Sequence, residues 1–334
     1  MHVIARTLTV CLFVVSLLTA APALAQFETA AVLGTVRDTS NATVPDATVT
    51  LTNVETGLIL KKATSGTGDY EFPAVKVGTY VVTAEKAGFA VALVDNVQAE
   101  VSARLRVDLQ MTIGGVTERV TVTAATPLME TDSSQRSQII TGDQMRALPL
   151  NGREYSALAL LTTGVRQSAL NKSTNGTPRE GAFNVNGLRS TFNNFLIDGV
   201  DNNAYGTSNQ GFSNQVMQPA PDAVAEFKVV TNNMSAEYGR SGGATINVAY
   251  ASGTNRIRGS AWEFMRRTEL NATGFFKPAS GVKPDYDRDQ FGGVIGGPII
   301  KNKAFFFADA EFFRQTRGQT ATSTIATTAQ RAPP

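Results

Sequence analysis

Side chains that commonly carry out chemistry are almost absent from this sequence. Its 334 residues include one cysteine and one histidine, Cys11 and His2, and both lie within the first 11 residues. If those residues are cleaved, the mature chain has neither thiol nor imidazole, which excludes disulfides, cysteine nucleophiles, Ser-His-Asp hydrolysis and histidine-ligated zinc within it. A mechanism that uses carboxylates alone stays open, but no pattern indicates one. We therefore expect no enzyme, no cofactor and no metal site.

Residues 1–25 have the three parts of a secretory signal peptide. Arg6 supplies a positive charge, residues 7–18 form a short apolar run, and residues 23–25 form an A-x-A cleavage site. The run is shorter than the roughly 20 residues of a membrane helix, although an N-terminal anchor is the alternative. Losing Arg6 lowers the net charge from +2 to +1. Charge therefore gives no reason to expect nucleic acid or an anionic membrane surface as partner.

Residues 26–112 consist of short runs in which polar and apolar residues alternate, with turn residues between them. Several such runs at spacings of about 10 residues, without a long helical pattern, predict a β-sandwich. We expect strands at 32–36, 48–53, 70–73, 80–84 and 104–111. Aromatic residues of this unit should lie in the core or at corners, with an aromatic edge that binds sugar or peptide as the alternative. They are Tyr70, Phe72, Tyr80 and Phe89.

The order of the blocks GTVRD, VPDATVTLTN, GDYEF, VGTY and AGF in this unit resembles the carboxypeptidase regulatory-like domain, a transthyretin-like sandwich. The resemblance covers nearly all of residues 26–112. It implies no peptidase here, because the catalytic zinc domain of those enzymes and its histidine ligands have no counterpart in the sequence.

The middle of the chain is built around the block FNVNGLRSTFNNFLIDGVDNN, residues 183–203. Its alternation predicts a short strand, a turn centred on Gly187, and a second strand at residues 195–197. Later blocks predict a helical turn feeding a strand at residues 221–231 and a glycine-rich turn feeding a strand at 236–248. Upstream, Thr141 should cap a helix over residues 142–148, and residues 155–161 should form a second short helix. These elements together predict a small α/β domain.

These blocks, in this order, resemble the plug domain of TonB-dependent outer-membrane transporters, in the subgroup called Oar-like. The resemblance rests on the NG-LR-NN-LIDGVDN block, the AEYGRSGG turn and the strand that follows. Asn186 departs from the pattern, because most plugs outside this subgroup carry arginine before the glycine. Ligand contacts of siderophore transporters are therefore not transferred to this chain.

Residues 113–125 join the two units, and residues 117–124 within them look like a TonB box. The resemblance implies that an energy-coupling protein pairs with this segment, since an extended segment offers its backbone hydrogen bonds to a partner sheet. An ordinary strand with the pattern E-x-V-x-V is the alternative. The candidate coupling residues are Glu118, Arg119, Val120, Thr121 and Val122.

Asparagine-rich loops of the plug are the expected ligand-facing surface, because loops carry recognition on such scaffolds. The alternative is that these residues occupy turns that tolerate positive φ. The candidate ligand-facing residues are Asn193, Asn194, Phe195, Asn202, Asn203, Tyr205 and Phe212.

Residues 251–334 predict the first strands of a membrane β-barrel, at 256–267, 289–300 and 304–313. A long loop and a tight turn at 301–303 separate them, as in barrels with long external loops and short periplasmic turns. The strands of a soluble β-sandwich, which is the alternative, would also show alternating polar and apolar residues. The last strand sets an apolar face against carboxylates, which suits lipid outside and water inside: Phe306, Ala308, Ala310 and Phe312 against Asp309 and Glu311. The blocks GSAWEFMRR and RDQFGGVIGGPIIKNKAFFF resemble the start of the Oar-like barrel.

The predicted fold class is mainly β: a transthyretin-like sandwich at 26–112, a small α/β plug at 113–250, and barrel strands at 251–334. Transporters of this class close about 22 strands around the plug, and open strand edges in lipid are costly. This sequence predicts about three, so we expect it to be the N-terminal fragment of a longer protein.

The resemblance implies energy-coupled import of a bulky solute across the outer membrane of a Gram-negative bacterium. The solute would be an oligosaccharide, a peptide or a siderophore. Expected partners are a TonB-type coupling protein in the periplasm, the extracellular solute and outer-membrane lipid, and not nucleic acid. The alternative is a secreted or surface β-sandwich module that binds carbohydrate or peptide without transport. A third hypothesis is an accessory subunit of an exported hydrolase.

Overall fold

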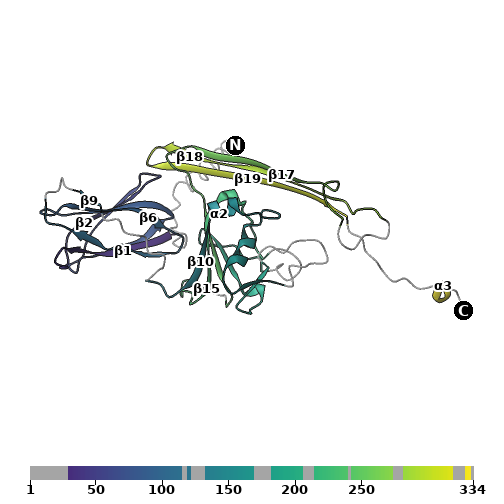
Figure 1. The fold of residues 1–334 in the computed structure, drawn as a ribbon, viewed down its shortest axis with the longest axis horizontal. Coiled ribbons are helices and arrows are strands. Elements are labelled where there is room, and N and C mark those ends of the chain that lie inside the picture. Colours follow the sequence, from purple (N-terminus) through teal and green to yellow (C-terminus); the bar gives the residue numbers. More distant parts are fainter. Residues whose placement is uncertain are drawn as a thin grey trace, which may run out of the picture.

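The computed structural model describes residues 29–114, 119–121, 132–168, 182–205, 214–239, 242–273, 281–318 and 328–331. They form three β-rich units in chain order (Figure 1). A purple to blue sandwich lies beside a teal second unit, and three long green to yellow strands run across the second unit. The predicted fold class, mainly β, is confirmed. None of the helices in this described part is long and apolar enough to cross a membrane.

The first unit is a sandwich of two sheets. One has the order β4-β1-β7, with β8 also paired to β1, and the other has the order β3-β2-β5-β6-β9. The strands are β1 (Thr29–Asp38), β2 (Thr48–Asn53), β3 (Ile59–Ala63), β4 (Asp69–Lys76), β5 (Gly78–Glu85), β6 (Val91–Ala99), β7 (Arg104–Arg106), β8 (Leu109–Met111) and β9 (Arg119–Thr121). The sequence did not predict β3 or β6.

The core of the sandwich comes from alternate residues of both sheets, because successive side chains of a strand point to opposite faces. Val32 of β1, Val49 of β2 and Val82 of β5 are completely buried. Tyr70 and Tyr80 are also buried, and each hydroxyl donates to a backbone carbonyl, Tyr70 Oη to Val107 O at 2.6 Å and Tyr80 Oη to Lys76 O at 2.8 Å. Phe72 is buried as well, and Phe89 is partly buried against the same core. The core prediction for these aromatic residues is therefore confirmed.

The second unit has a five-stranded sheet of order β10-β15-β16-β13-β14 and a separate pair, β11-β12. Figure 1 shows its helical turns on the side of the sheet that lies away from the sandwich. The elements are β10 (Arg136–Thr141), α2 (Gly142–Ala147), η1 (Tyr155–Leu161), β11 (Val165–Gln167), β12 (Phe183–Val185), η3 (Ser190–Phe192), β13 (Asn194–Ile197), β14 (Val200–Asp201), η4 (Pro221–Ala223), β15 (Val224–Asn232) and β16 (Thr245–Tyr250).

The helical turns cover a core that the sheet supplies from one face. Phe227 of β15 is completely buried, and its ring packs edge-on against Tyr155 of η1 at 5.3 Å between centroids. Thr141 caps α2 as predicted, in a capping box in which Thr141 Oγ1 accepts from Gln144 N and Gln144 Oε1 accepts from Thr141 N. The second predicted helix, η1, is a 3-10 helix that begins without a side-chain cap.

The two strands of the 183–203 block belong to different sheets. β12 pairs with β11, whereas β13 lies parallel to β16 in the main sheet. Between them the chain turns at Asn186 and Gly187, whose φ angles are +50° and +84°. The block therefore links the small sheet to the large one and is not a simple hairpin.

The third unit is an antiparallel sheet of β17 (Arg258–Arg266), β18 (Tyr286–Ile300) and β19 (Ala304–Arg317); a short helix, α3 (Thr328–Arg331), follows. The chain enters it from β16 past Gly253. An added Cβ at Gly253 would lie 2.3 Å from Phe306 O and 2.7 Å from Gly297 O, so only glycine fits where the connection crosses β18 and β19. This close approach joins the second and third units tightly.

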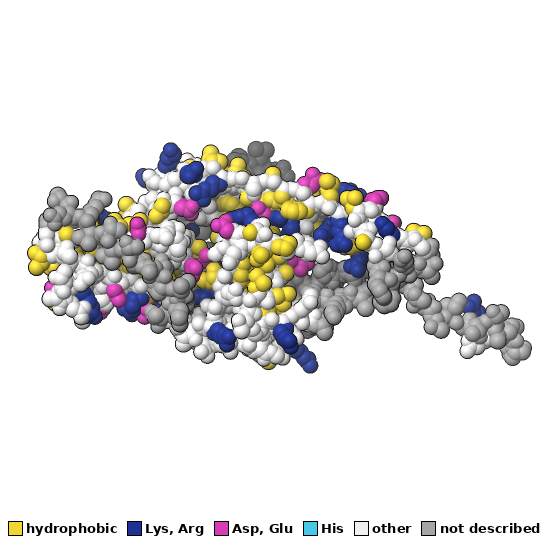
Figure 2. Space-filling model, viewed as in Figure 1, with side chains coloured by type: hydrophobic (Ala, Val, Ile, Leu, Met, Phe, Trp, Pro, Cys, Tyr) yellow, Lys and Arg dark blue, Asp and Glu magenta, His cyan; other side chains and the backbone are white. Residues whose placement is uncertain are grey.

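The three long strands have one face toward the plug-like unit and one face away from it. Ser260 Oγ donates to Asp222 Oδ1 at 3.4 Å and Gln290 Nε2 donates to Gly152 O at 3.2 Å, which defines the inner face. On the outer face Phe291 and Phe312 stack at 5.3 Å and are 44% and 59% exposed. Figure 2 shows hydrophobic side chains exposed along these strands and over the helical turns. The alternation predicted for residues 304–313 is therefore present.

Candidate functional site

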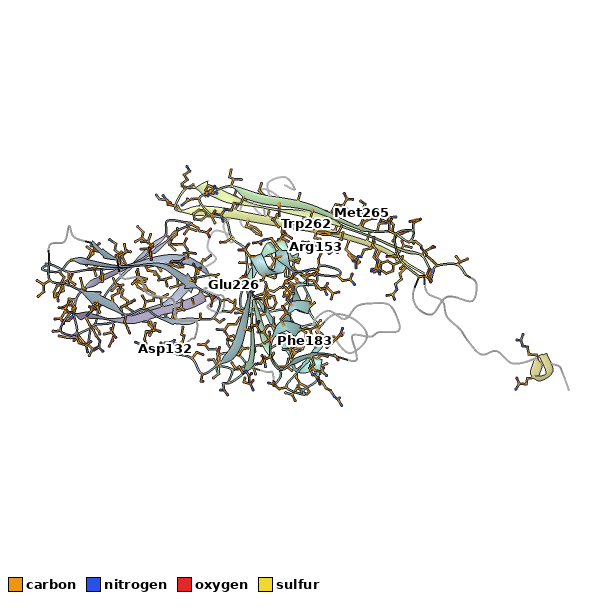
Figure 3. The ribbon with its side chains drawn as sticks, viewed as in Figure 1. Asp132, Arg153, Phe183, Glu226, Trp262 and Met265 are labelled. Atoms are coloured by element: carbon orange, nitrogen blue, oxygen red, sulfur yellow. The ribbon has the colours of Figure 1, made fainter. Side chains whose placement is uncertain are left out.

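A turn of the second unit places one arginine between that unit and the long strands. Gly152 and Arg153 both have positive φ, +95° and +57°, which reverses the chain before η1. Figure 3 shows Arg153 at the top of the second unit, next to Trp262 of β17. Its side chain is 13% exposed, so a full positive charge is held in a largely dry contact.

Arg153 binds both units at once. Its guanidinium group pairs with Asp222 of η4 and with Glu311 of β19, Nε to Oε2 at 3.3 Å. It also lies over two aromatic rings of β17, with Cζ 4.8 Å from the centroid of Trp262 and 4.6 Å from that of Phe264. A desolvated arginine over aromatic faces adds cation–π attraction to the ion pairs. These contacts hold the second unit against the inner face of the strands.

The Glu311 carboxylate accepts two further hydrogen bonds from side chains of the long strands. Oε2 accepts from Trp262 Nε1 at 3.1 Å, and Oε1 accepts from Gln290 Nε2 at 2.9 Å. Together with Arg153, these donors fix the position of the Glu311 carboxylate. Across the described residues, no three histidine, cysteine, aspartate or glutamate side chains come together as metal ligands. The arrangement is suited to holding the second unit against the long strands.

Sequence analysis did not identify Arg153 as a functional residue. Arg153 and Glu311 are 158 residues apart, and neither belongs to a recognisable motif. One signal was available: Glu311 was predicted on the inner face of a strand whose other face is apolar, and a buried carboxylate needs a cation.

The predicted ligand-facing residues are mostly buried. Asn193 is 7% exposed; its Nδ2 donates to Phe183 O at 2.7 Å and its Oδ1 accepts from Ala244 N at 3.2 Å. Asn194 is 7% exposed and Phe195 is completely buried. The prediction of a surface is wrong for these three residues, because their side chains tie neighbouring strands together or fill the core.

The side chains of the second asparagine pair, Asn202 and Asn203, also form hydrogen bonds within the second unit. Asn202 is buried and forms two hydrogen bonds with the backbone of Met217. Its Oδ1 accepts from Met217 N at 2.7 Å, and its Nδ2 donates to Met217 O at 2.9 Å. The prediction is therefore wrong for Asn202 too. Asn203 Oδ1 accepts from Phe195 N at 2.9 Å, so its half-buried side chain supports β13. Tyr205 is 64% exposed, with its hydroxyl donating to Asp201 Oδ2 at 2.7 Å. Phe212 lies outside the described residues.

Part of the predicted coupling segment forms a strand of the sandwich. Residues 119–121 are β9, which pairs in parallel with β6. Glu118 and Val122 lie outside the described residues. Residues 119–121 are thus extended, and the strand they join belongs to the same chain.

A polar joint connects the sandwich to the second unit. Glu226 of β15 lies on the side of the second unit that faces the sandwich (Figure 3), and both Glu226 and Lys228 of the same strand are buried. Val101 N donates to Glu226 Oε1, Lys228 Nζ donates to Ser102 O at 3.1 Å, and Asn247 Nδ2 donates to Ser102 Oγ at 2.9 Å. Burial raises the pKa of the Glu226 carboxyl to about 7, against the opposing effect of the bond from Val101.

Each of the three units matches a family model. Residues 31–112 match the carboxypeptidase regulatory-like domain, residues 129–246 the TonB-dependent receptor plug domain, and residues 249–333 an outer membrane β-barrel domain. The three matches follow the order sandwich, plug and barrel strands, and they confirm the resemblance inferred from the sequence.

The chain is also similar to the TonB-dependent transporter Oar of Myxococcus xanthus. The two are 25% identical over 299 residues, which is 84% of this chain and 26% of Oar. The chain therefore spans about a quarter of the length of this relative.

Two solved structures are also similar. The siderophore receptor PirA of Acinetobacter baumannii is 18% identical, with a TM-score of 0.40 over 59% of this chain and 26% of PirA. The siderophore receptor PirA of Pseudomonas aeruginosa is 20% identical, with a TM-score of 0.35 over 54% of this chain and 28% of that receptor.

Proposed function

We propose that this protein is an outer-membrane transporter that binds a bulky solute at the cell surface and imports it. Energy comes from a TonB-type protein in the periplasm, which pulls on the segment containing residues 118–122. Residues 1–25 act as the signal peptide for export. The observation that supports this most directly is Arg153, which holds the plug against the inner face of the barrel strands through Asp222 and Glu311.

The geometry favours transport over chemistry. The buried charges of Arg153 and Glu311 pair with each other, and Glu311 also accepts hydrogen bonds from the strands. These contacts hold the plug in place until a force displaces it. No reaction, cofactor or metal is part of the proposal. The solute is an oligosaccharide, a peptide or a siderophore, and the additional sandwich domain favours the first two.

The coupling step can be tested on the intact protein purified in detergent. We expect the periplasmic domain of the TonB-type protein from the same bacterium to bind the wild type and to lose binding when residues 118–122 are deleted. A matched deletion of residues 65–67, in an exposed turn of the sandwich, should leave binding unchanged. Equal binding by the 118–122 deletion and the wild type would exclude this segment as the coupling site.

Membrane fractionation tests the location separately. We expect the intact protein in the outer-membrane fraction, released only by detergent. Recovery as a water-soluble species would favour the secreted β-sandwich module and contradict transport.

A further inference from the structure

The chain itself covers the edge of the larger sheet in the sandwich. β6 pairs on one side with β5 and on the other side with β9, which is the last described strand of that sheet (Figure 1). Without β9, the β6 edge would carry unpaired backbone N–H and C=O groups, which readily accept another strand. The parallel register places Val91 opposite Arg119, Ala92 opposite Val120 and Leu93 opposite Thr121.

The sandwich that supplies this edge is itself fixed in place. Arg106 donates three hydrogen bonds to Asp132 at the start of the plug, at 2.8, 3.0 and 3.3 Å. Glu226 of the plug accepts from Val101, as described above. The sandwich also reaches the barrel, where Arg258 Nη1 lies 2.9 Å from Glu55 Oε1. While residues 119–121 remain on β6, a pull on them is therefore carried first by the sandwich and its anchors, and does not pass directly along the chain to the plug.

We propose that the β6 edge is an intramolecular docking site that holds residues 119–121, and that the coupling protein must remove this segment before it can pull on the plug. The proposal rests on the proposed function, because it takes these residues as part of the segment that the coupling protein binds. Both interactions are strand additions, which use the backbone groups of the same short segment. The sandwich domain thus restrains coupling.

A disulfide can fix the segment on β6, since the sequence after residue 11 contains no cysteine. Leu93 and Thr121 are directly opposite in register, and Leu93 is half-buried. Adjacent strands lie about 4.8 Å apart, within the range of about 4.4–6.8 Å between Cα atoms that a disulfide spans. The test variant is Leu93→Cys with Thr121→Cys in the intact protein. The control is Gln98→Cys with Thr121→Cys, because exposed Gln98 lies five residues further along β6, about 16 Å away.

We expect oxidation to link the Leu93→Cys/Thr121→Cys variant and not the control. The oxidised variant should bind the periplasmic domain of the TonB-type protein at least tenfold more weakly than the same variant after reduction. Absence of the disulfide overturns docking on β6. If the oxidised, linked variant binds the coupling domain as well as the reduced variant does, the segment need not leave β6 before coupling, and the proposed restraint is contradicted. The coupling protein would then pair with the outer edge of β9.

Failure of the proposed function gives a different result. If the wild type itself does not bind the coupling domain, transport coupling through this segment is contradicted. The yield of the disulfide in the Leu93→Cys/Thr121→Cys variant still decides whether β6 holds the segment.

Discussion

Arg153 supplies the positive charge between two carboxylates that come from different units. Its side chain is 13% exposed, and those of Asp222 and Glu311 are 14% and 20% exposed. Arg153→Ala leaves both carboxylates without this partner in a nearly dry contact. Removing one member of a buried ion pair costs about 3–5 kcal/mol. We expect the plug to loosen, measured as faster hydrogen exchange at the backbone amides around η1.

Arg146→Ala is the matched control. Arg146 pairs with Asp143 at 2.6 Å, but the Asp143 side chain is 94% exposed. An exposed pair of this kind contributes less than about 1 kcal/mol. Exchange around η1 should therefore match the wild type in this variant. If Arg153→Ala gives the same exchange pattern as Arg146→Ala, the ion pairs do not hold the plug.

Glu226 makes the joint between sandwich and plug dependent on pH. Burial raises the pKa of its carboxyl from 4.5 to about 7. Between these two values the folded protein keeps a proton that the unfolded chain has released, so stability falls as pH rises from about 4.5 to about 7. A shift of this size corresponds to about 3 kcal/mol. We expect the urea midpoint of the sandwich and plug to be lower at pH 8 than at pH 5.

Glu226→Gln isolates this effect, because the amide keeps an oxygen for Val101 N–H and does not titrate. The variant should lose most of the difference between pH 5 and pH 8. Glu237→Gln removes the same charge from an exposed position and should retain the wild-type difference. An equal pH dependence in Glu226→Gln and the wild type would show that another group is responsible.

At the scale of elements, α2 depends on its cap, because a helix of six residues has few internal hydrogen bonds. Thr141→Ala removes the side-chain acceptor for Gln144 N and should lower the free energy of unfolding by about 1 kcal/mol. Thr141→Ser keeps the hydroxyl and should lie close to the wild type. Urea unfolding of the three proteins checks this. Equal losses in both variants would show that the methyl group of Thr141, and not the capping box, matters.

Elements with a regular period could be predicted from the sequence, and the others could not. β2, β5 and β19 alternate clearly, and the capping residues of α2 are local. β3 was missed because nearly all of its side chains are exposed, which removes the alternation. β6 was missed because Asp95 and Asn96 interrupt it, and Asn96 has a φ of +54°.

The candidate site was much less predictable, because its contacts join distant parts of the chain. The asparagine-rich loops were recognised as special, but their composition does not reveal that Asn193 bonds to Ala244, 51 residues away. Alternation placed Glu311 on the inner face, yet only the fold brings Arg153 to it. Local patterns therefore gave the faces of the strands and not the partners across the interfaces.

At the scale of the whole molecule, the two faces of the barrel strands should differ sharply in their tolerance of charge. Ala310 and Val294 test this at nearly the same depth. Ala310 pairs with Gly293 on the outer face, whereas Val294 pairs with Asp309 and with Ser260, whose hydroxyl contacts the plug. Residues directly opposite in an antiparallel pair share a face. One substitution at each position therefore probes lipid on one side and the plug on the other.

Ala310→Lys places a charge toward lipid, which costs about 2–4 kcal/mol near the middle of a membrane. Val294→Lys places the same charge on the inner face, directly opposite Asp309, where a cross-strand pair is favourable. We expect Ala310→Lys to lower the yield of protein assembled in the outer membrane and Val294→Lys to leave it nearly unchanged. Heat-modifiable migration on gels measures that yield. The reverse order would mean that the face with Phe291 and Phe312 does not contact lipid, and that the strands enclose the plug in some other way.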